Sequence, residues 1–429
     1  MRPACITRSS RARALCVVVW LALAGCGGGG GQSSTTQGVN ADVKFLSDYM
    51  ADWYFWYPRL PAVDLSTFAT PEAALTALHV AEDRYSFIEP AQTFNALFDN
   101  GQALGFGLGY VVLGTQVLTR FVQPLGSAAT AGLKRGDRIV SIAGTPVETL
   151  IAQNALDAAF GPATEGFSLV LNVQRAGQRF DLPMTKQWYQ LRNVLDARVL
   201  NNAGRKVGYI NFFSFNTPAQ GEWDTALQQV LDAGAQDLVV DLRENGGGLL
   251  SVADSLASGL APAGLTGQTY GRLEFNDKHT SANTTLTFQA KGNAGRIANL
   301  VWITSPRTCS ASESLMVSLR PYRTASSVGE TTCGKPVGFT APTFNGKVYN
   351  IVTFRNVNRD GLTDYYQGLA ADCTAGDDYT TPFGDPAELK LAAALAILGG
   401  ATCPAPAAKY AARPVVTGLP GMVNLTGLY

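Results

Sequence analysis

The sequence predicts a multidomain α+β protein, in which a helical N-terminal region precedes a β-rich domain and a layered α/β domain. Apolar residues recur at helical spacing in residues 41–100, and short alternating strands follow in residues 101–186. In residues 187–400, apolar strands alternate with helical segments. The 429 residues allow two or three domains of about 150 residues each.

Composition excludes several classes of function. The chain has 33 basic and 33 acidic residues, so it offers no excess of positive charge for binding nucleic acid. His79 and His279 are the only two histidines, and no cysteine pair has the spacing of a zinc site. A histidine-based triad or metal centre is therefore disfavoured, and we expect no metal.

The N-terminus predicts export. Residues 1–25 combine several arginines with a short apolar run, which is typical of a signal peptide. The segment Leu23–Cys26 resembles the bacterial lipobox, which implies lipidation of Cys26; an ordinary cleaved signal peptide is the alternative. Residues 26–40 are a glycine-rich, flexible linker. We expect a lipid-anchored protein of the bacterial cell envelope that faces the periplasm. Because Gly27 is not Asp, the outer membrane is favoured over the inner one.

The helical region begins with Val43, Leu46 and Met50 at helical spacing, and Pro71 starts a second helix that runs to about His79. The aromatic cluster Trp53–Tyr57 is either a docking surface or core packing, and core packing is favoured.

Residues 101–186 contain a glycine-rich entry into a strand and a segment, Ser127–Gly144, that looks like part of a PDZ domain. That resemblance implies that one loop binds the C-terminal carboxylate of a peptide while the next strand pairs with the peptide. The loop consists of Gly105, Phe106, Gly107 and Leu108. A plain tight turn is the alternative interpretation.

The α/β domain is predicted from strands at Val207–Phe212, Asp237–Leu242 and Val301–Thr304 with helices between them. We expect Thr217–Gln220 to form a capping box at the start of the first of these helices.

Three segments of this domain carry chemistry. Asp241–Gly248 is a strand end that runs into glycines, where bare N–H groups can face an anion. Thr308–Glu313 places a serine at a helix start, where it is either a nucleophile or an N-cap. Gly329–Gly338 presents one lysine among small residues, and burial lowers the pKa of such an amine enough for it to act as a base.

Together, the three segments resemble the S41 peptidases, the C-terminal processing proteases, which are Ser-Lys enzymes with an inserted PDZ domain. The matching stretches are Asp241–Gly248, Ser310–Glu313 and Gly329–Lys335. Agreement of three motifs in order is more specific than any one of them. The resemblance extends over residues 41–400 and implies a ClpP/crotonase-like catalytic domain that needs no cofactor.

The resemblance implies a role for each matching residue. Ser310 is the nucleophile and Lys335 the general base, while the N–H groups of Ala311 and Gly247 form the oxyanion hole. Asp241, Arg243 and Asn245 hold their loop. Glu313 either assists the dyad or supports Lys335 or Arg243. One departure is Phe339, which stands where the processing-protease branch has Gln.

The expected function is that of a serine endopeptidase that cleaves exported polypeptides recognised through free C-termini. The alternatives are a catalytically silent, peptide-binding lipoprotein and a PDZ adaptor on the same scaffold.

Four cysteines remain after the lipidation site, and they allow three pairings. If Ser310 and Lys335 lie within hydrogen-bonding reach, Cys309 and Cys333 are close enough for a disulfide, which leaves Cys373 to pair with Cys403 near the start of the 401–429 tail. Unpaired buried thiols are the alternative.

Overall fold

The computed structural model describes residues 39–404. The predicted signal peptide, Cys26 and most of the predicted linker and tail lie outside the described residues, so what the sequence predicts of them stays a prediction. Within the described part of the chain, no helix has both the length and the apolar character needed to cross a bilayer.

The sequence predicts a helical N-terminal region. The structure has these helices and one strand as well. Besides α1 (Ala41–Trp53), α2 (Pro71–Leu78), α3 (Ala91–Phe98) and two short 3₁₀ turns, the region contains strand β1 (Phe87–Pro90). β1 pairs antiparallel with β19 (Lys347–Asn350), which in turn pairs with β18 (Thr343–Phe344). The region therefore adds one strand to a small sheet with β19 and β18.

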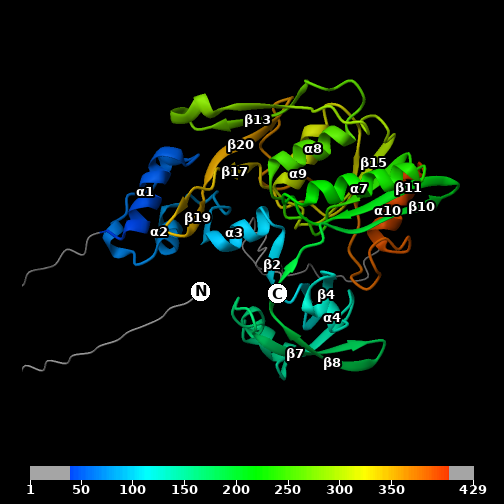
Figure 1. The fold of residues 1–429 in the computed structure, drawn as a ribbon, viewed down its shortest axis with the longest axis horizontal. Coiled ribbons are helices and arrows are strands. Elements are labelled where there is room, and N and C mark those ends of the chain that lie inside the picture. Colours follow the sequence, from blue (N-terminus) through cyan, green and yellow to red (C-terminus); the bar gives the residue numbers. More distant parts are fainter. Residues whose placement is uncertain (1–38, 405–429) are drawn as a thin grey trace, which may run out of the picture. The chain divides into compact units, whose positions relative to one another are not determined.

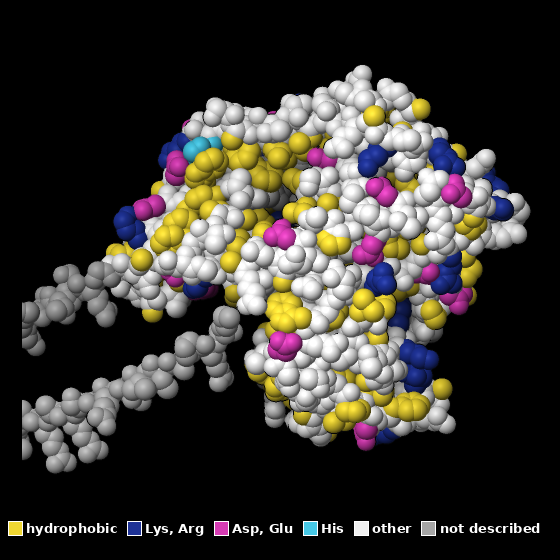
Figure 2. Space-filling view, in the orientation of Figure 1, with side chains coloured by type: hydrophobic (Ala, Val, Ile, Leu, Met, Phe, Trp, Pro, Cys, Tyr) yellow, Lys and Arg dark blue, Asp and Glu magenta, His cyan; other side chains and the backbone are white. Residues whose placement is uncertain are grey.

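The aromatic cluster at the end of α1 is mainly packing. Tyr54 is fully buried in a core that also contains Val43, Leu46 and Tyr349, while its neighbours are half-buried against it. Phe45, Tyr49 and Trp53 form a stacked row along α1. Hydrophobic side chains also gather over this part of the face drawn in Figure 2.

The middle domain has its own sheet, with strand order β3-β4-β5-β7-β8, and β6 beside β5. Its strands are β3 (Leu108–Leu113), β4 (Gln116–Val122), β5 (Arg138–Ile142), β6 (Thr145–Pro146), β7 (Ser168–Arg175) and β8 (Gln178–Thr185). Short helices α4 (Ser127–Thr130), α5 (Val147–Ala152) and α6 (Leu156–Ala159) cover a separate core. Before this sheet, β2 (Gln102–Gly105) pairs with β9 (Gln187–Gln190), so two strands join the domain to the next.

The α/β domain is layered, as predicted. Its main sheet has the order β10-β11-β12-β15-β16-β21, and all its strands are parallel except β10. These strands are β10 (Val194–Asn202), β11 (Arg205–Phe212), β12 (Asp237–Asp241), β15 (Asn299–Thr304), β16 (Ser326–Gly329) and β21 (Cys373–Thr374). Three helices pack on one face of this sheet: α7 (Ala219–Asp232), α8 (Leu250–Leu260) and α9 (Ala311–Leu319). α10 (Leu389–Leu398) covers the other face (Figure 1).

Alternation along β12 explains why helices cover both faces. Val240 belongs to the core under α7–α9, whereas its neighbour Val239 belongs to the core under α10. A strand buried on both faces reads as a continuous apolar run, as this one does. The predicted capping box at Thr217 is wrong, because the side chain of Asn216 accepts the N–H of Ala219 instead.

A second sheet supplies two of the phenylalanines, Phe339 and Phe354, that line a pocket described below. Its order is β14-β13-β20-β17, with β13 (Thr269–Phe275), β14 (Thr284–Thr287), β17 (Val337–Phe339) and β20 (Val352–Asn358). The 3₁₀ segment Asp277–Ala282 follows β13.

Candidate active site

Ser310 lies at the start of α9, just after the loop that leaves β15. Its φ is 56°, in the left-handed region that non-glycine residues rarely adopt. The serine is thus held in a strained conformation of the kind that clusters at functional sites. The N–H groups in the first turn of α9 give this end of the helix a partial positive charge.

Lys335 lies on the loop that leaves β16, the strand next to β15. Burial lowers the pKa of its amine to about 8, against the opposing charges of Asp83 and Glu313. The Nζ atom is 4.2 Å from the ring centroid of Phe339 and 6.0 Å from that of Tyr85. Lys335 and Ser310 line the same pocket of about 240 Å³.

The wall of this pocket is mostly apolar. It includes five phenylalanines and two leucines alongside Gly246, Gly248 and Tyr365; these side chains are Phe87, Phe94, Phe98, Phe339, Phe354, Leu249 and Leu250. An apolar wall with few polar groups at one end is typical of a binding pocket. Neither described histidine lines it.

The fully buried carboxylate of Glu313 joins the two loops. It accepts the backbone N–H of Ser310 at 3.0 Å and those of Gly334 and Lys335 at 2.8 Å. It also accepts the hydroxyl of Thr332. Burial raises the pKa of Glu313, while these hydrogen bonds oppose the shift. Three of these contacts are to backbone N–H groups of the two loops, so Glu313 is a positioning residue.

Disulfides bridge the same two loops and tie down the end of the described chain. Cys309 is joined to Cys333 with 5.2 Å between their Cα atoms, and Cys373 to Cys403 with 5.4 Å. These are the pairings expected from the sequence. The first connects the residue before Ser310 to the loop of Lys335.

The glycine loop after β12 lies against the serine. Asn245 donates to the carbonyl of Phe212, and its Oδ1 accepts the N–H of Gly247 at 2.8 Å. The expectation that Gly247 supplies an oxyanion donor is therefore not met, because that N–H is already engaged. Gly248 lines the pocket instead, and within residues 39–404 its N–H has no hydrogen-bond acceptor.

Gly247 must be glycine for a steric reason. Its φ is 99°, and a Cβ there would lie 2.8 Å from Cβ of Ser310 and 2.9 Å from the nitrogen of Ala311. The loop thus approaches Ser310 as closely as backbone allows.

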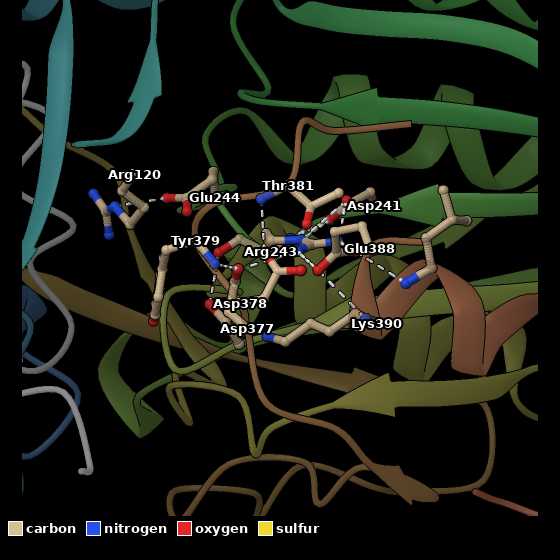
Figure 3. Close-up of polar contacts among 12 residues, drawn as sticks. Arg120, Asp241, Arg243, Glu244, Asp377, Asp378, Tyr379, Thr381, Glu388 and Lys390 are labelled. Carbon is tan, nitrogen blue, oxygen red and sulfur yellow. Dashed lines mark hydrogen bonds and ion pairs between the residues drawn. The ribbon is translucent and has the colours of Figure 1, made fainter. Parts of the chain in front are cut away.

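Arg243 anchors this loop from beneath, in the cluster of buried charges shown in Figure 3. Its guanidinium contacts Asp241 at 2.9 Å, Glu388 at 2.7 Å and Asp377 at 3.1 Å. Burial alone lowers the pKa of Arg243, but these carboxylates outweigh burial and raise it. Asp241 and Arg243 therefore hold the loop, in agreement with the sequence-based interpretation.

Residues 206–374 match Peptidase family S41, and residues 43–87 match the Peptidase S41 N-terminal domain. The chain therefore contains an S41 peptidase domain, preceded by the N-terminal domain of the same family. The matched range contains Ser310, Lys335 and all of the glycine loop.

Relatives and structures of the S41 family agree with this. A carboxyl-terminal-processing protease of Synechocystis is 31% identical over 208 residues, which cover 48% of this chain and 47% of that protein. A chloroplastic C-terminal processing peptidase of Tetradesmus obliquus is 28% identical, over 62% of this chain and 59% of that protein. An S41 protease structure from Bacteroides fragilis has the same fold, with a TM-score of 0.67 at 24% identity over 83% of this chain and 97% of that one. The chain spans 47% to 62% of the length of the first three curated relatives.

The S41 N-terminal domain supplies residues that the sequence analysis missed. Arg84 donates to the carbonyls of Cys333 and Tyr366, and Tyr85 donates to the carbonyl of Gly334. Tyr85 and Gly334 are 249 positions apart, so no local pattern could have joined them. Their contacts fix the loop that carries Lys335.

The residues expected to bind a peptide C-terminus fall at a strand junction. Gly105 ends β2 and pairs with Gln187, whereas Leu108 begins β3, so only Phe106 and Gly107 form the connection. The carbonyls of Phe106 and Gly107 accept the N–H groups of Ala128 and Gln123. A Cβ at Gly107 would lie 2.8 Å from the Cα of Gly126, so the backbones touch there.

A first prediction concerns Arg243. Arg243→Met leaves Asp241 and Glu388 buried without their cation, while Asp377 keeps its pair with Arg135, so we expect the free energy of unfolding to fall by about 3–5 kcal/mol. Urea unfolding measures this. Arg59→Met, which breaks an exposed pair with Glu82, is the control and should leave the urea midpoint nearly unchanged. Equal effects of the two changes would contradict the anchoring role.

Proposed function

We propose that this protein is a serine endopeptidase of the C-terminal processing type, with Ser310 as nucleophile and Lys335 as general base. The observation that carries the proposal is that Ser310 and a buried lysine, whose pKa is lowered to about 8, line one apolar pocket. An amine with that pKa is neutral in a useful fraction of molecules near neutral pH, and only the neutral amine accepts a proton.

The proposed reaction runs in two halves. Lys335 takes the hydroxyl proton of Ser310 while Oγ attacks the carbonyl carbon of the scissile peptide bond. The ammonium then gives this proton to the leaving amine as the C–N bond breaks, which leaves an acyl-enzyme. Water attacks the ester with Lys335 again as base, and Ser310 regains its proton as the acid product leaves.

The N–H groups of Ala311 and Gly248 are the proposed oxyanion donors. Ala311 is the first residue of α9, and Gly248 lines the pocket with a free N–H among the described residues. Donors aimed at the developing negative charge are worth about 100-fold or more in rate each.

Supporting evidence for export comes from the disulfides. Both cysteine pairs described are oxidised, which fits a compartment such as the periplasm. We therefore keep the proposal of a lipid anchor at Cys26 in the bacterial envelope, favouring the outer membrane, and of exported polypeptides as substrates.

We also propose that the middle domain selects substrates by their C-termini, as its PDZ-like segment implies. Strand β3 lies at one end of the sheet order, so its outer edge has no partner strand within residues 39–404. An unpaired edge of this kind can add a peptide strand, while the turn at Phe106 and Gly107 lies where the strand begins.

The dyad is tested by substitution. Ser310→Ala and Lys335→Ala should each abolish the cleavage of unfolded polypeptides. Mass spectrometry of the products measures this cleavage. His79→Ala and His279→Ala should retain it, because His79 bonds to the carbonyl of Val80 and His279 stacks on Trp53, both outside the pocket. Loss of cleavage in a folded histidine variant would overturn the dyad, and retained cleavage in Ser310→Ala would favour a silent or different enzyme.

The pH dependence follows from the lysine. At pH values below about 8, the pKa of Lys335, most of the amine is protonated and cannot act as a base. We therefore expect kcat/KM to rise with pH and to level off above that pH. Steady-state rates between about pH 6 and 10 measure the rising part of this pH profile. A flat profile across that interval contradicts a lysine base.

C-terminal selection is tested with a matched pair of peptides. A good substrate and the same peptide with an amidated C-terminus differ only in the carboxylate, so the amide should show a raised KM. Equal kinetic constants for acid and amide would remove the docking role without affecting the dyad.

A further inference from the structure

The environment of the Lys335 amine is built from aromatic rings. Nζ lies 4.2 Å from the ring centroid of Phe339 and 6.0 Å from that of Tyr85. Among the residues that the structure describes, no oxygen accepts a hydrogen bond from Nζ. Phe339 is the nearer of these two rings to the amine.

We propose that Phe339 is a positioning residue, whose ring face orients the amine of Lys335 and stabilises the ammonium that forms when it takes the proton of Ser310. The proposal rests on the proposed function. It also accounts for the departure noted in the sequence, where a phenylalanine stands in place of a hydrogen-bonding glutamine.

The backbone aims the ring at the amine. Phe339 ends β17, and the pairing of β17 with β20 shifts register between Gly338 and Phe339. Such an irregularity redirects the side chain that follows it. At Gly338 a Cβ would lie 2.4 Å from the ring of Phe354, so that position is closed to a side chain.

A second ring limits the motion of the first. Phe87 of β1 packs edge-to-face against Phe339, with 5.9 Å between ring centroids. Phe87 belongs to the N-terminal region and lines the same pocket, yet it makes no ring contact with Nζ among those described. This makes Phe87 a matched control, because it is an aromatic neighbour of the site without the cation contact.

The Phe339 ring affects the charged and the neutral amine of Lys335 differently, which distinguishes a cation–π contact from simple packing. The face of an aromatic ring is negative and attracts an ammonium, but it gains much less from a neutral amine. In the resting enzyme, the ring thus opposes the effect of burial on the lysine. In the transition state, where the ammonium forms, the same attraction lowers the barrier, which is how an interaction accelerates a reaction.

Fluorination tests this without changing shape. Replacing Phe339 of the full chain by trifluorophenylalanine weakens the negative ring face and nearly preserves its volume. We expect the pKa of Lys335 to fall by about half a unit to one unit and kcat to fall about three- to tenfold. Monofluorophenylalanine should give an intermediate shift of both quantities.

Two readouts keep the result independent of catalysis. The pKa is measured by NMR of ¹³C-labelled lysine in a Ser310→Ala background, with the signal assigned by its loss in Lys335→Met. The rate is measured as the pH profile of kcat in the protein with Ser310 present. If cleavage proves not to depend on Ser310, the proposed function fails, while the NMR titration still decides whether the ring contacts the amine.

Controls define what overturns the proposal. The same fluorinated residue at Phe87 should leave the pKa of Lys335 unchanged, even where it alters KM. Phe339→Leu should lower the pKa and kcat, and Phe339→Gln should restore the pKa by supplying an oxygen acceptor. An unchanged pKa with trifluorophenylalanine at 339, or an equal shift from the change at 87, overturns the proposal.

Discussion

The geometry of the candidate dyad depends on one carboxylate. Ser310 follows β15 and Lys335 follows β16, and because these strands are parallel neighbours their carboxyl ends meet at one edge of the sheet. Closeness alone does not fix the position of one loop relative to the other. Glu313 fixes it by accepting N–H groups from both loops, and the disulfide between Cys309 and Cys333 adds a covalent link between them. Removing the carboxylate would leave several buried donors without an acceptor.

Arg243 solves a related problem on the third loop. The glycines need freedom to approach Ser310, so they cannot stabilise themselves by side-chain packing. The loop is instead fixed by Arg243 on one side and by the bonds of Asn245 on the other. Asp377 in the same cluster also pairs with Arg135 of the middle domain, so this anchor lies where two domains meet.

Sequence reasoning succeeded where the signal is local. The double-sided burial of β12 is visible as an apolar run, and the three motifs each lie within about ten residues. It failed where the decisive partner is distant or is backbone. The pairing of β1 with β19 and the contacts of Tyr85 with Gly334 join segments far apart in the chain. The proposal of Gly248 in place of Gly247 as an oxyanion donor depends on one hydrogen bond from the Gly247 N–H to Asn245, which motif spacing cannot reveal.

The buried position of Lys335 sets the charge of its amine against its reactivity. Nearby carboxylates favour the ammonium, and both Asp83 and Glu313 raise the pKa of Lys335, yet burial prevails and the value remains near 8. These carboxylates are already engaged with other donors: Asp83 accepts N–H groups of Tyr85 and Ser86, and Glu313 accepts those of Ser310 and Lys335. Their negative charge therefore organises backbone and forms no hydrogen bond with the amine. An aromatic ring can then hold the amine without the strong preference for the charged form that a direct carboxylate contact would impose.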